Sequence, residues 1–175
     1  MSYNIGGYDP SWGSHIPVLI DVFRNSKGPV LELGTGPFST PLLHTLCVDN
    51  KRTLISFENN PEFFNMHETF VNEFHQINLI DDWDKADIEN THWGLVLVDQ
   101  RPAERRVAEI KRLVNNADYI AIHDSEPDKT GTYHYDLIYP LFKYRLDYIL
   151  RPDYAHTTVL SNLKDLTKLK RAIPS

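Results

Sequence analysis

The sequence has little cysteine, no long hydrophobic run and no excess of positive charge. Cys47 is its single cysteine, which excludes an intrachain disulfide and a zinc cluster built from several thiols. Its longest apolar runs, such as 96–98 and 119–122, are far shorter than the roughly 20 residues that cross a bilayer. We therefore expect no membrane partner, and we expect a cytoplasmic location because few cysteines are typical of a reducing compartment.

The N-terminus argues against a secreted protein, and the net charge argues against a protein that binds nucleic acid. The first residues, MSYNIGGYDPSWG, lack the basic start and the apolar centre of a secretory signal, so we expect none. The formal net charge of -6 argues against a broad surface for binding phosphates. Nucleic acid is therefore an unfavoured partner, and a small molecule or another protein is favoured.

The sequence does have the composition of an ordinary globular domain, with 41% hydrophobic and 24% charged residues. We expect a single domain over residues 1–175. Within it, residues 1–28 would form an N-terminal lid segment and a first helix, and residues 164–175 would form a basic, solvated tail. Short β-branched runs alternate with longer amphipathic stretches, and this alternation predicts an α/β fold.

The positions of these runs predict the architecture. Strands are expected at 29–34, 53–58, 76–80, 93–99, 118–123, 146–150 and 157–160. Helices are expected at 14–26 with Ser14 as cap, at 39–48, from 61 onward, at 103–114 and at 135–143. The last two strands must be antiparallel, because the link between them is too short for a parallel crossover. The result is a seven-stranded, mostly parallel sheet with a C-terminal antiparallel pair and helices on both faces.

The most informative motif is a glycine loop between the first strand and the helix after it, LELGTGPFST at 31–40. Gly34 and Gly36, on either side of Thr35, let the backbone turn sharply and approach a ligand closely. Ser39 can cap the helix that follows. A tight turn without a ligand is the alternative explanation, but the position before a helix favours a nucleotide-type ligand.

Two acids near this loop indicate which ligand it holds. Glu58 ends the second strand, where a carboxylate can accept both hydroxyls of an adenosine ribose, although a solvated strand-end acid is the alternative. Glu32 is expected at the mouth of the loop, where it would repel a pyrophosphate and attract an ammonium or sulfonium group. A pyrophosphate site would also need a third Gly or Ala where this chain has Ser39. S-adenosylmethionine, which carries both cations, is the favoured cofactor.

With these residues the chain resembles a class I S-adenosylmethionine-dependent methyltransferase over nearly all of its length. The resemblance rests on the loop at 32–39, on Glu58 and on the terminal antiparallel strand pair. It implies a Rossmann-like fold, a glycine loop that faces the methionine moiety, and Glu58 with Asn59 at the ribose. It also implies that the loop after the third strand contacts the adenine through an acid and an aromatic ring, here Asp81, Asp82 and Trp83.

Catalytic residues are expected at the ends of the fourth and fifth strands, because ligands of open α/β sheets lie outside the carboxyl edge. Strand four ends in Asp99, and strand five ends in His123-Asp124. Transfer of a methyl group needs an aligned nucleophile and, for a hydroxyl or amine, removal of a proton. His123 suits a base near neutral pH, with Asp99 or Asp124 to orient its ring. A histidine that only caps the strand is the alternative.

A magnesium ion is a second use of the same carboxylates. Asp99 and Asp124, with Ser125 or Glu126 nearby, offer the hard oxygen ligands that magnesium prefers. Catechol-type O-methyltransferases, which this region resembles, have an Asp-Asn pair at the end of strand five. This chain has Asp124-Ser125 instead, so we predict no metal. The His-Asp pair is more similar to that of small methyltransferases that act on sugars and related metabolites.

Other residues near the predicted site have two interpretations each. Three arginines could bind an anionic substrate but are more typical of a solvated helix face, namely Arg101, Arg105 and Arg106. Aromatic residues of the N-terminal segment either cover the cofactor as a lid or pack on the first helix, namely Tyr3, Tyr8, Trp12 and His15.

The sequence thus predicts an S-adenosylmethionine-dependent methyltransferase, O-directed toward a small polar acceptor. Because no cap domain is inserted, the acceptor must be recognised by the N-terminal segment, by the loop at 124–135 or by another subunit of a homo-oligomer. Two alternatives stay open: a non-catalytic methyltransferase-like subunit that binds the cofactor or a partner as a scaffold, and an NAD-dependent oxidoreductase. Glu32, Ser39 and the lack of a second substrate domain oppose the oxidoreductase.

Overall fold

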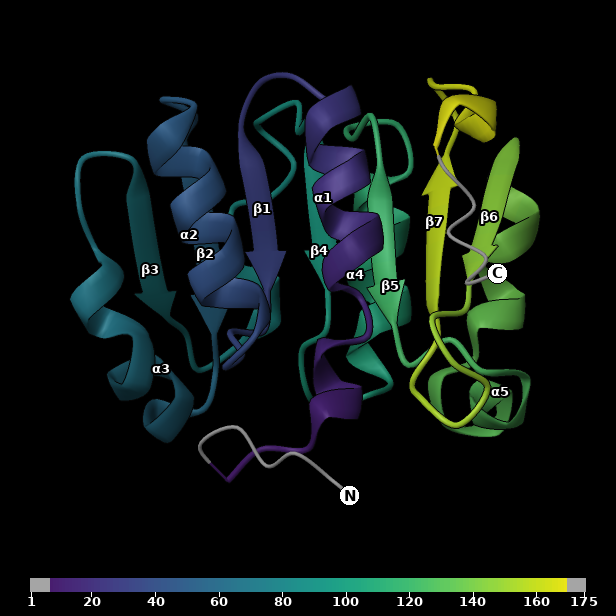
Figure 1. The fold of residues 1–175 in the computed structure, drawn as a ribbon, viewed down its shortest axis with the longest axis horizontal. Coiled ribbons are helices and arrows are strands. Elements are labelled where there is room, and N and C mark those ends of the chain that lie inside the picture. The colour runs from purple at the N-terminus through teal and green to yellow at the C-terminus, as the bar shows by residue number, and fades with distance from the viewer. Residues whose placement is uncertain (1–6, 170–175) are drawn as a thin grey trace.

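A computed structural model describes residues 7–169 and shows a sheet with helices on both sides (Figure 1). Within these residues the sheet has seven strands in the order β3-β2-β1-β4-β5-β7-β6. The strands are β1 (Val30–Leu33), β2 (Leu54–Glu58), β3 (His75–Leu79), β4 (Leu95–Val98), β5 (Ile120–His123), β6 (Tyr144–Tyr148) and β7 (Thr157–Ser161). The first five pair in parallel, and β7 is antiparallel to both β5 and β6. The predicted fold class is confirmed.

The helices enclose an apolar core on each face of the sheet. They are α1 (Ile16–Asn25), α2 (Ser39–Asp49), α3 (Pro61–His67), α4 (Arg105–Leu113) and α5 (Thr130–Tyr133). Alternate residues of β4 face opposite layers: Leu95 and Leu97 pack with α1 and α2, whereas Val96 and Val98 pack with α4. The continuous apolar run of β4 is what a strand covered on both faces requires. None of the helices within 7–169 has the length and hydrophobicity that a bilayer crossing requires.

A crevice opens at the carboxyl edge of the sheet between β1 and β4. The chain continues from β1 to β2 on one side and from β4 to β5 on the other, so the two connections lead to opposite sides of the sheet beyond their first residues. Gly34 follows β1 with a φ of +87°, and a Cβ atom there would lie 2.6 Å from the Cα atom of Gln100. The loops after β1 and β4 are therefore in close backbone contact at the position where open α/β sheets bind ligands.

The N-terminal turn closes one side of this crevice. A 3-10 turn over Pro10–Gly13 leads into α1, and the Phe38 ring lies so close to Gly13 that a Cβ atom there would be 3.1 Å from its Cδ1 atom. The Ser14 hydroxyl donates to the Ala155 carbonyl at 2.6 Å. Ser14 is therefore not the helix cap that we expected, since its side chain bonds the β6–β7 connection and His15 occupies the N-cap position.

Two other expectations about the chain are wrong. The helix expected at 135–143 is replaced by two 3-10 turns, because Pro140 lies in its centre and proline cannot continue an α-helix. The start of the expected solvated tail is packed against the sheet, with Leu166 and Leu169 both buried in the core. Tyr3 and the remainder of the tail, 170–175, lie outside the described residues.

Candidate functional site

The crevice contains a cavity of about 390 Å³ that gathers most of the predicted site residues. Those that line it are Gly34, Thr35, Gly36, Ser39, Glu58, Asn59, Asp99, His123 and Asp124. They come from the ends of β1, β2, β4 and β5, so four separate segments of the sequence meet at one place. The volume lies within the range of small-molecule sites, which is about 300 to 1,000 Å³.

Glu58 holds the first turn of the glycine loop. Its Oε2 atom accepts hydrogen bonds from the Thr35 backbone N–H at 2.7 Å and from the Thr35 hydroxyl at 3.1 Å. Its Oε1 atom accepts from the backbone N–H groups of Asn59 and Asn60 at 2.9 and 2.8 Å. These bonds use all four acceptor positions of a carboxylate. A ligand hydroxyl can therefore bind Glu58 once the Thr35 hydroxyl, which rotates freely, turns away.

Glu32 lies beneath the glycine loop, so its expected position at the mouth of the loop is wrong. Its side chain is completely buried between the sheet and α2 and does not line the cavity. Its carboxylate accepts from the hydroxyls of Thr40 at 3.0 Å and Ser56 at 2.7 Å, and Thr40 in turn accepts from the Gly36 backbone N–H. Burial raises the pKa of Glu32 to about 7. Glu32 thus fixes the loop from below and cannot touch a cation in the cavity.

The expected adenine contacts Asp81, Asp82 and Trp83 are also not brought to the cavity. Asp81 pairs with Lys85 at 2.7 Å on the surface, and Asp82 caps the short turn that follows it. Trp83 is buried in the core, where its Nε1–H donates to the Arg101 carbonyl at 2.9 Å. This expectation is wrong because the indole ring fills the core and the two acids cap and pair locally.

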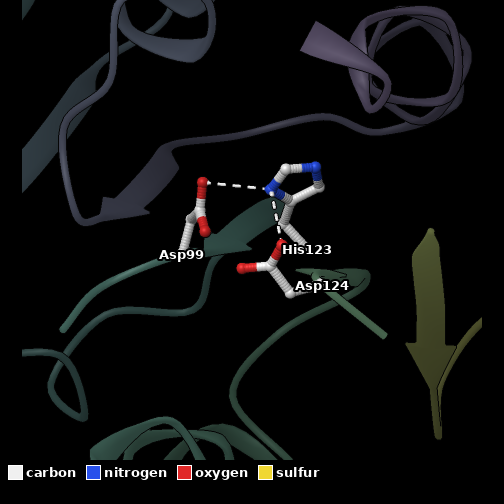
Figure 2. A group of neighbouring side chains, drawn as sticks. All are labelled: Asp99, His123 and Asp124. Atoms are coloured by element: carbon white, nitrogen blue, oxygen red, sulfur yellow. Dashed lines mark ion pairs between the residues drawn. The ribbon is translucent and has the colours of Figure 1, made fainter. Parts of the chain in front are cut away.

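His123 and two carboxylates form the polar end of the cavity (Figure 2). The Nδ1 atom of His123 lies 3.3 Å from Asp99 Oδ2 and 4.0 Å from Asp124 Oδ1, and the second ring nitrogen points away from both. Asp124 follows β5 with a φ of 54°, a left-handed conformation that aspartate adopts more readily than most residues. The sequence therefore identified three side chains that do lie together.

The hydrogen bonds of His123 favour its doubly protonated form. Its Nε2 atom lies 3.2 Å from the Ser14 hydroxyl, whose proton is donated to the Ala155 carbonyl, so Nε2 must donate. Its Nδ1 atom faces Asp99, and a bond to a carboxylate also requires a donor. Burial lowers the pKa of His123, but the charges of Asp99 and Asp124 outweigh burial and leave it above its ordinary value. A neutral His123 base, as we expected, conflicts with this arrangement.

Arg106 joins the ends of β4 and β5 and is the most important residue that the sequence analysis misjudged. Its guanidinium is buried and donates to carboxylate oxygens of Asp99 at 2.8 Å and Asp124 at 3.3 Å. It also donates to the backbone carbonyls of Asp99, Gln100 and His123. Arg106 is thus no solvated helix residue. Two carboxylates and two cations, Arg106 and His123, balance each other in one cluster.

Asp99, His123 and Asp124 offer ligand atoms that all lie within 4.8 Å of one another, as a metal site requires. Arg106 opposes this use, because its guanidinium already pairs with both Asp99 and Asp124. A divalent ion would have to displace or face that buried cation. The absence of a metal in the reaction stays a prediction.

Other residues of the cavity wall had no role in the sequence-based site. They are Phe38 on the glycine loop, Asn60 and Phe63 near the start of α3, and Gln100 after β4. Trp12 and His15, for which a lid was one of two interpretations, line the cavity from the N-terminal turn. Phe38 lies within the glycine-loop motif, whereas only the tertiary positions of the others reveal them.

The charge of His123 makes stability depend on pH. Because its pKa is raised in the folded state, its contribution to the free energy of unfolding is complete below the unfolded value of about 6.5 and is lost as pH rises through the folded value. Wild type should therefore lose stability relative to His123→Gln above pH 6.5, by ~1.4 kcal/mol for each unit of pKa elevation. Urea unfolding from pH 6 to 9 measures this difference.

His92→Gln is the matched control, because His92 is exposed and pairs with Asp118 at the surface. Its free energy of unfolding at pH 6 should stay within about 0.5 kcal/mol of that of wild type. Equal slopes for His123→Gln and wild type above pH 6.5 would show that the folded protein does not hold His123 protonated.

Comparison with known proteins identifies the fold. No protein-family model matches the sequence, and no curated protein does. Among solved structures, a human methyltransferase 10 domain-containing protein matches with a TM-score of 0.60 at 10% identity, over 89% of this chain and 81% of that chain. Cofactor-bound Rv0187 from MTB matches with a TM-score of 0.58 at 14% identity, over 91% and 92%. The hMettl16 catalytic domain in complex with MAT2A 3'UTR hairpin 1 matches with a TM-score of 0.58 at 9% identity, over 86% and 69%.

These structures and the strand order agree on the architecture. The chain has the Rossmann-like fold of class I S-adenosylmethionine-dependent methyltransferases, with the antiparallel β7 between β5 and β6. At such low identities the match concerns the fold, so the activity must be argued from the site.

Proposed function

We propose that the protein is an S-adenosylmethionine-dependent methyltransferase that acts on a hydroxyl group of a small polar acceptor. The observation that carries this proposal is the single cavity in which the glycine loop, the acid after β2 and the cluster after β4 and β5 meet. One end of this cavity suits an adenosine, and the other end has the charged groups that a proton transfer needs. A solved structure of the same fold, the N-terminal domain of human METTL16, is described in complex with SAH, which supports the choice of cofactor.

The residues that would hold the cofactor are those of the glycine loop and of the β2 end. Backbone groups at 34–36 border the cavity with no side chain on either glycine, and Glu58 offers a carboxylate to the ribose hydroxyls. Asn60 and Phe63 lie next to Glu58 and take the place at the adenine that we expected for the loop after β3. When bound, S-adenosylmethionine supplies an electrophilic methyl group on a sulfonium.

Asp124 is the group that we propose to accept the proton of the acceptor hydroxyl. Its Oδ2 atom is engaged by Arg106 and by the Tyr133 hydroxyl at 3.0 Å, whereas its Oδ1 atom has His123 only at 4.0 Å, beyond hydrogen-bond distance. Oδ1 is thus placed to receive a donor from the cavity. His123 would act as a fixed cation that orients Asp99 and Asp124.

RNA is a second candidate acceptor, because the matched hMettl16 domain is described in complex with an RNA hairpin. The formal net charge of this chain is -6, which would repel a phosphate backbone. We therefore favour a small acceptor. Binding of a short RNA to the protein at low salt, and its loss at high salt, would reverse this preference.

Calorimetry with S-adenosylmethionine, S-adenosylhomocysteine and NAD tests the cofactor. We expect the first two to bind and NAD not to bind. Binding of NAD alone would replace the proposal by an oxidoreductase, and binding of none would favour the scaffold subunit.

Glu58→Ala should weaken S-adenosylhomocysteine binding by more than tenfold. The ribose would lose a charged acceptor, worth about 1.5 to 3 kcal/mol, and the loop would lose the bonds that Glu58 accepts from Thr35. Glu58→Gln, which keeps one acceptor oxygen, should lose less. Glu62→Ala, an exposed acid at the start of α3, is the control and should bind as wild type does. Unchanged affinity in Glu58→Ala would remove Glu58 from the site.

A further inference from the structure

His15 is a buried side chain whose hydrogen-bonding capacity is unused. It is 2% exposed, and neither ring nitrogen has a hydrogen-bond partner. Buried polar atoms are nearly always satisfied, so each exception requires a cause. His15 lines the cavity beside His123, with the two rings edge to face and 4.7 Å apart. A ligand in the cavity would supply the missing partner.

Aromatic side chains also line this cavity. Phe38 packs on the backbone of Gly13. Trp12, the residue before Gly13, also lines the cavity wall. Trp12 is 47% exposed, and its ring centroid lies 5.8 Å from that of Tyr8. Exposed aromatic faces beside a cavity favour a planar apolar ligand.

The charges near His15 favour a neutral ligand. Burial lowers the pKa of His15 to about 3, so its ring is neutral at physiological pH and offers one donor and one acceptor. The adjacent cluster balances the cations Arg106 and His123 against Asp99 and Asp124. Within this cluster neither an ammonium nor a carboxylate on the acceptor would find an unpaired opposite charge, although the exposed Arg101 also lines the cavity.

The proposed base adds a condition on the acidity of the acceptor. A carboxylate such as Asp124 is a weak base, and removal of a proton by a weak base is easier from an acidic hydroxyl. A phenolic hydroxyl, with a pKa of about 10 as in tyrosine, meets this condition far better than an alkyl hydroxyl does. The aromatic lining and the weak base therefore both favour an acceptor with a phenolic hydroxyl.

We infer that Trp12, Phe38 and His15 form the acceptor site, and that the acceptor is a neutral planar molecule with a phenol-type hydroxyl that hydrogen-bonds to His15. This inference rests on the proposed function. In the reaction the phenolic oxygen forms a bond to the methyl carbon while the carbon–sulfur bond breaks. The sulfur keeps the electron pair, which leaves neutral S-adenosylhomocysteine, and the phenolic proton passes to Asp124.

Binding of small probes to the protein saturated with S-adenosylhomocysteine tests this inference. Phenol should bind, and cyclohexanol, benzoate and benzylammonium should each bind at least fivefold more weakly in saturation-transfer NMR titrations. His15→Phe, which keeps the ring volume and removes both nitrogens, should weaken phenol binding at least fivefold, and Trp12→Ala should do the same. His92→Phe, at an exposed position, is the control and should bind phenol as wild type does.

A measurement on the wild type covers the case in which a variant does not fold. Phenol should shift the ring nitrogen resonances of His15 in ¹⁵N-labelled protein and leave those of His92 unchanged. The inference would be overturned if phenol bound to His15→Phe as tightly as to wild type. It would also be overturned if cyclohexanol bound as tightly as phenol, or if benzoate or benzylammonium bound more tightly than phenol. Tighter binding of a short RNA that is lost in His15→Phe would assign the site to a nucleobase instead.

The two proposals fail in different ways. If S-adenosylhomocysteine binds and phenol binding does not depend on His15, the acceptor inference is wrong and the methyltransferase proposal stands. If S-adenosylhomocysteine does not bind but phenol binds through His15, the aromatic site exists and the proposed reaction is wrong.

Discussion

Arg106→Met should lower the free energy of unfolding by about 3 to 5 kcal/mol, the cost of breaking a buried ion pair from one side. The substitution leaves Asp99 and Asp124 without the guanidinium that pairs with both, and three backbone carbonyls without their donor. Arg106→Lys should lose less stability, since it keeps the charge but not the planar fork that reaches both strand ends. Urea unfolding at pH 7 measures both.

Lys111→Met provides the control on the same helix, because Lys111 is exposed. Its stability should stay within about 0.5 kcal/mol of wild type. If Arg106→Met were as stable as Lys111→Met, the charge cluster would contribute nothing to the fold. The same variant should also raise the pKa of His123 further, because the charge of Arg106 lowers this pKa whereas Asp99 and Asp124 raise it.

Gly34→Ala should abolish measurable binding of S-adenosylhomocysteine, with a loss of at least a hundredfold. The added Cβ atom would lie 2.6 Å from Gln100 Cα and 2.8 Å from the Asp99 carbonyl carbon, and both are backbone atoms that no rotamer can move away. The φ of +87° at Gly34 adds backbone strain for alanine. The loops after β1 and β4 would have to separate, which destroys the floor of the cavity. Calorimetry on the folded variant measures the loss.

Gly36→Ala is the matched comparison within the same loop. A Cβ atom at Gly36 meets only the Ser39 hydroxyl, at 3.2 Å, and that side chain can turn. Binding should therefore fall much less than in Gly34→Ala. Equal losses in the two variants would mean that loop flexibility, not the close approach to β4, determines the affinity.

The strands could be predicted because each depends on a local pattern. The run at 95–98 is apolar throughout and lies between helices on both faces, and the short link before β7 forces an antiparallel pair. The helix expected at 135–143 fails for an equally local reason, since Pro140 should have been read as a break.

The side chains of the site were harder to predict, because burial is decided by packing between distant segments. Glu32 and Trp83 both lie at positions that a motif marks as part of a site. Residues of α2 cover Glu32, however, and the apolar core covers Trp83. Arg106 did carry a signal that we did not use. It lies four residues before Ile110 and seven before Leu113, on the buried stripe of α4, where an arginine must find partners. No pattern marks His15, whose unused nitrogens are visible only in the folded chain.

The connection between β6 and β7 bonds two segments that border the His123 end of the cavity. Ala155 accepts the hydroxyl of Ser14 from the N-terminal turn, and His156 accepts the backbone N–H of Ser125 from the loop after β5. A change in the length of this hairpin would shift the N-terminal turn and the loop after β5 together, and with them Asp124, which precedes Ser125. A surface hairpin that contributes no lining residue would therefore alter acceptor binding and the position of the proposed base in the same step.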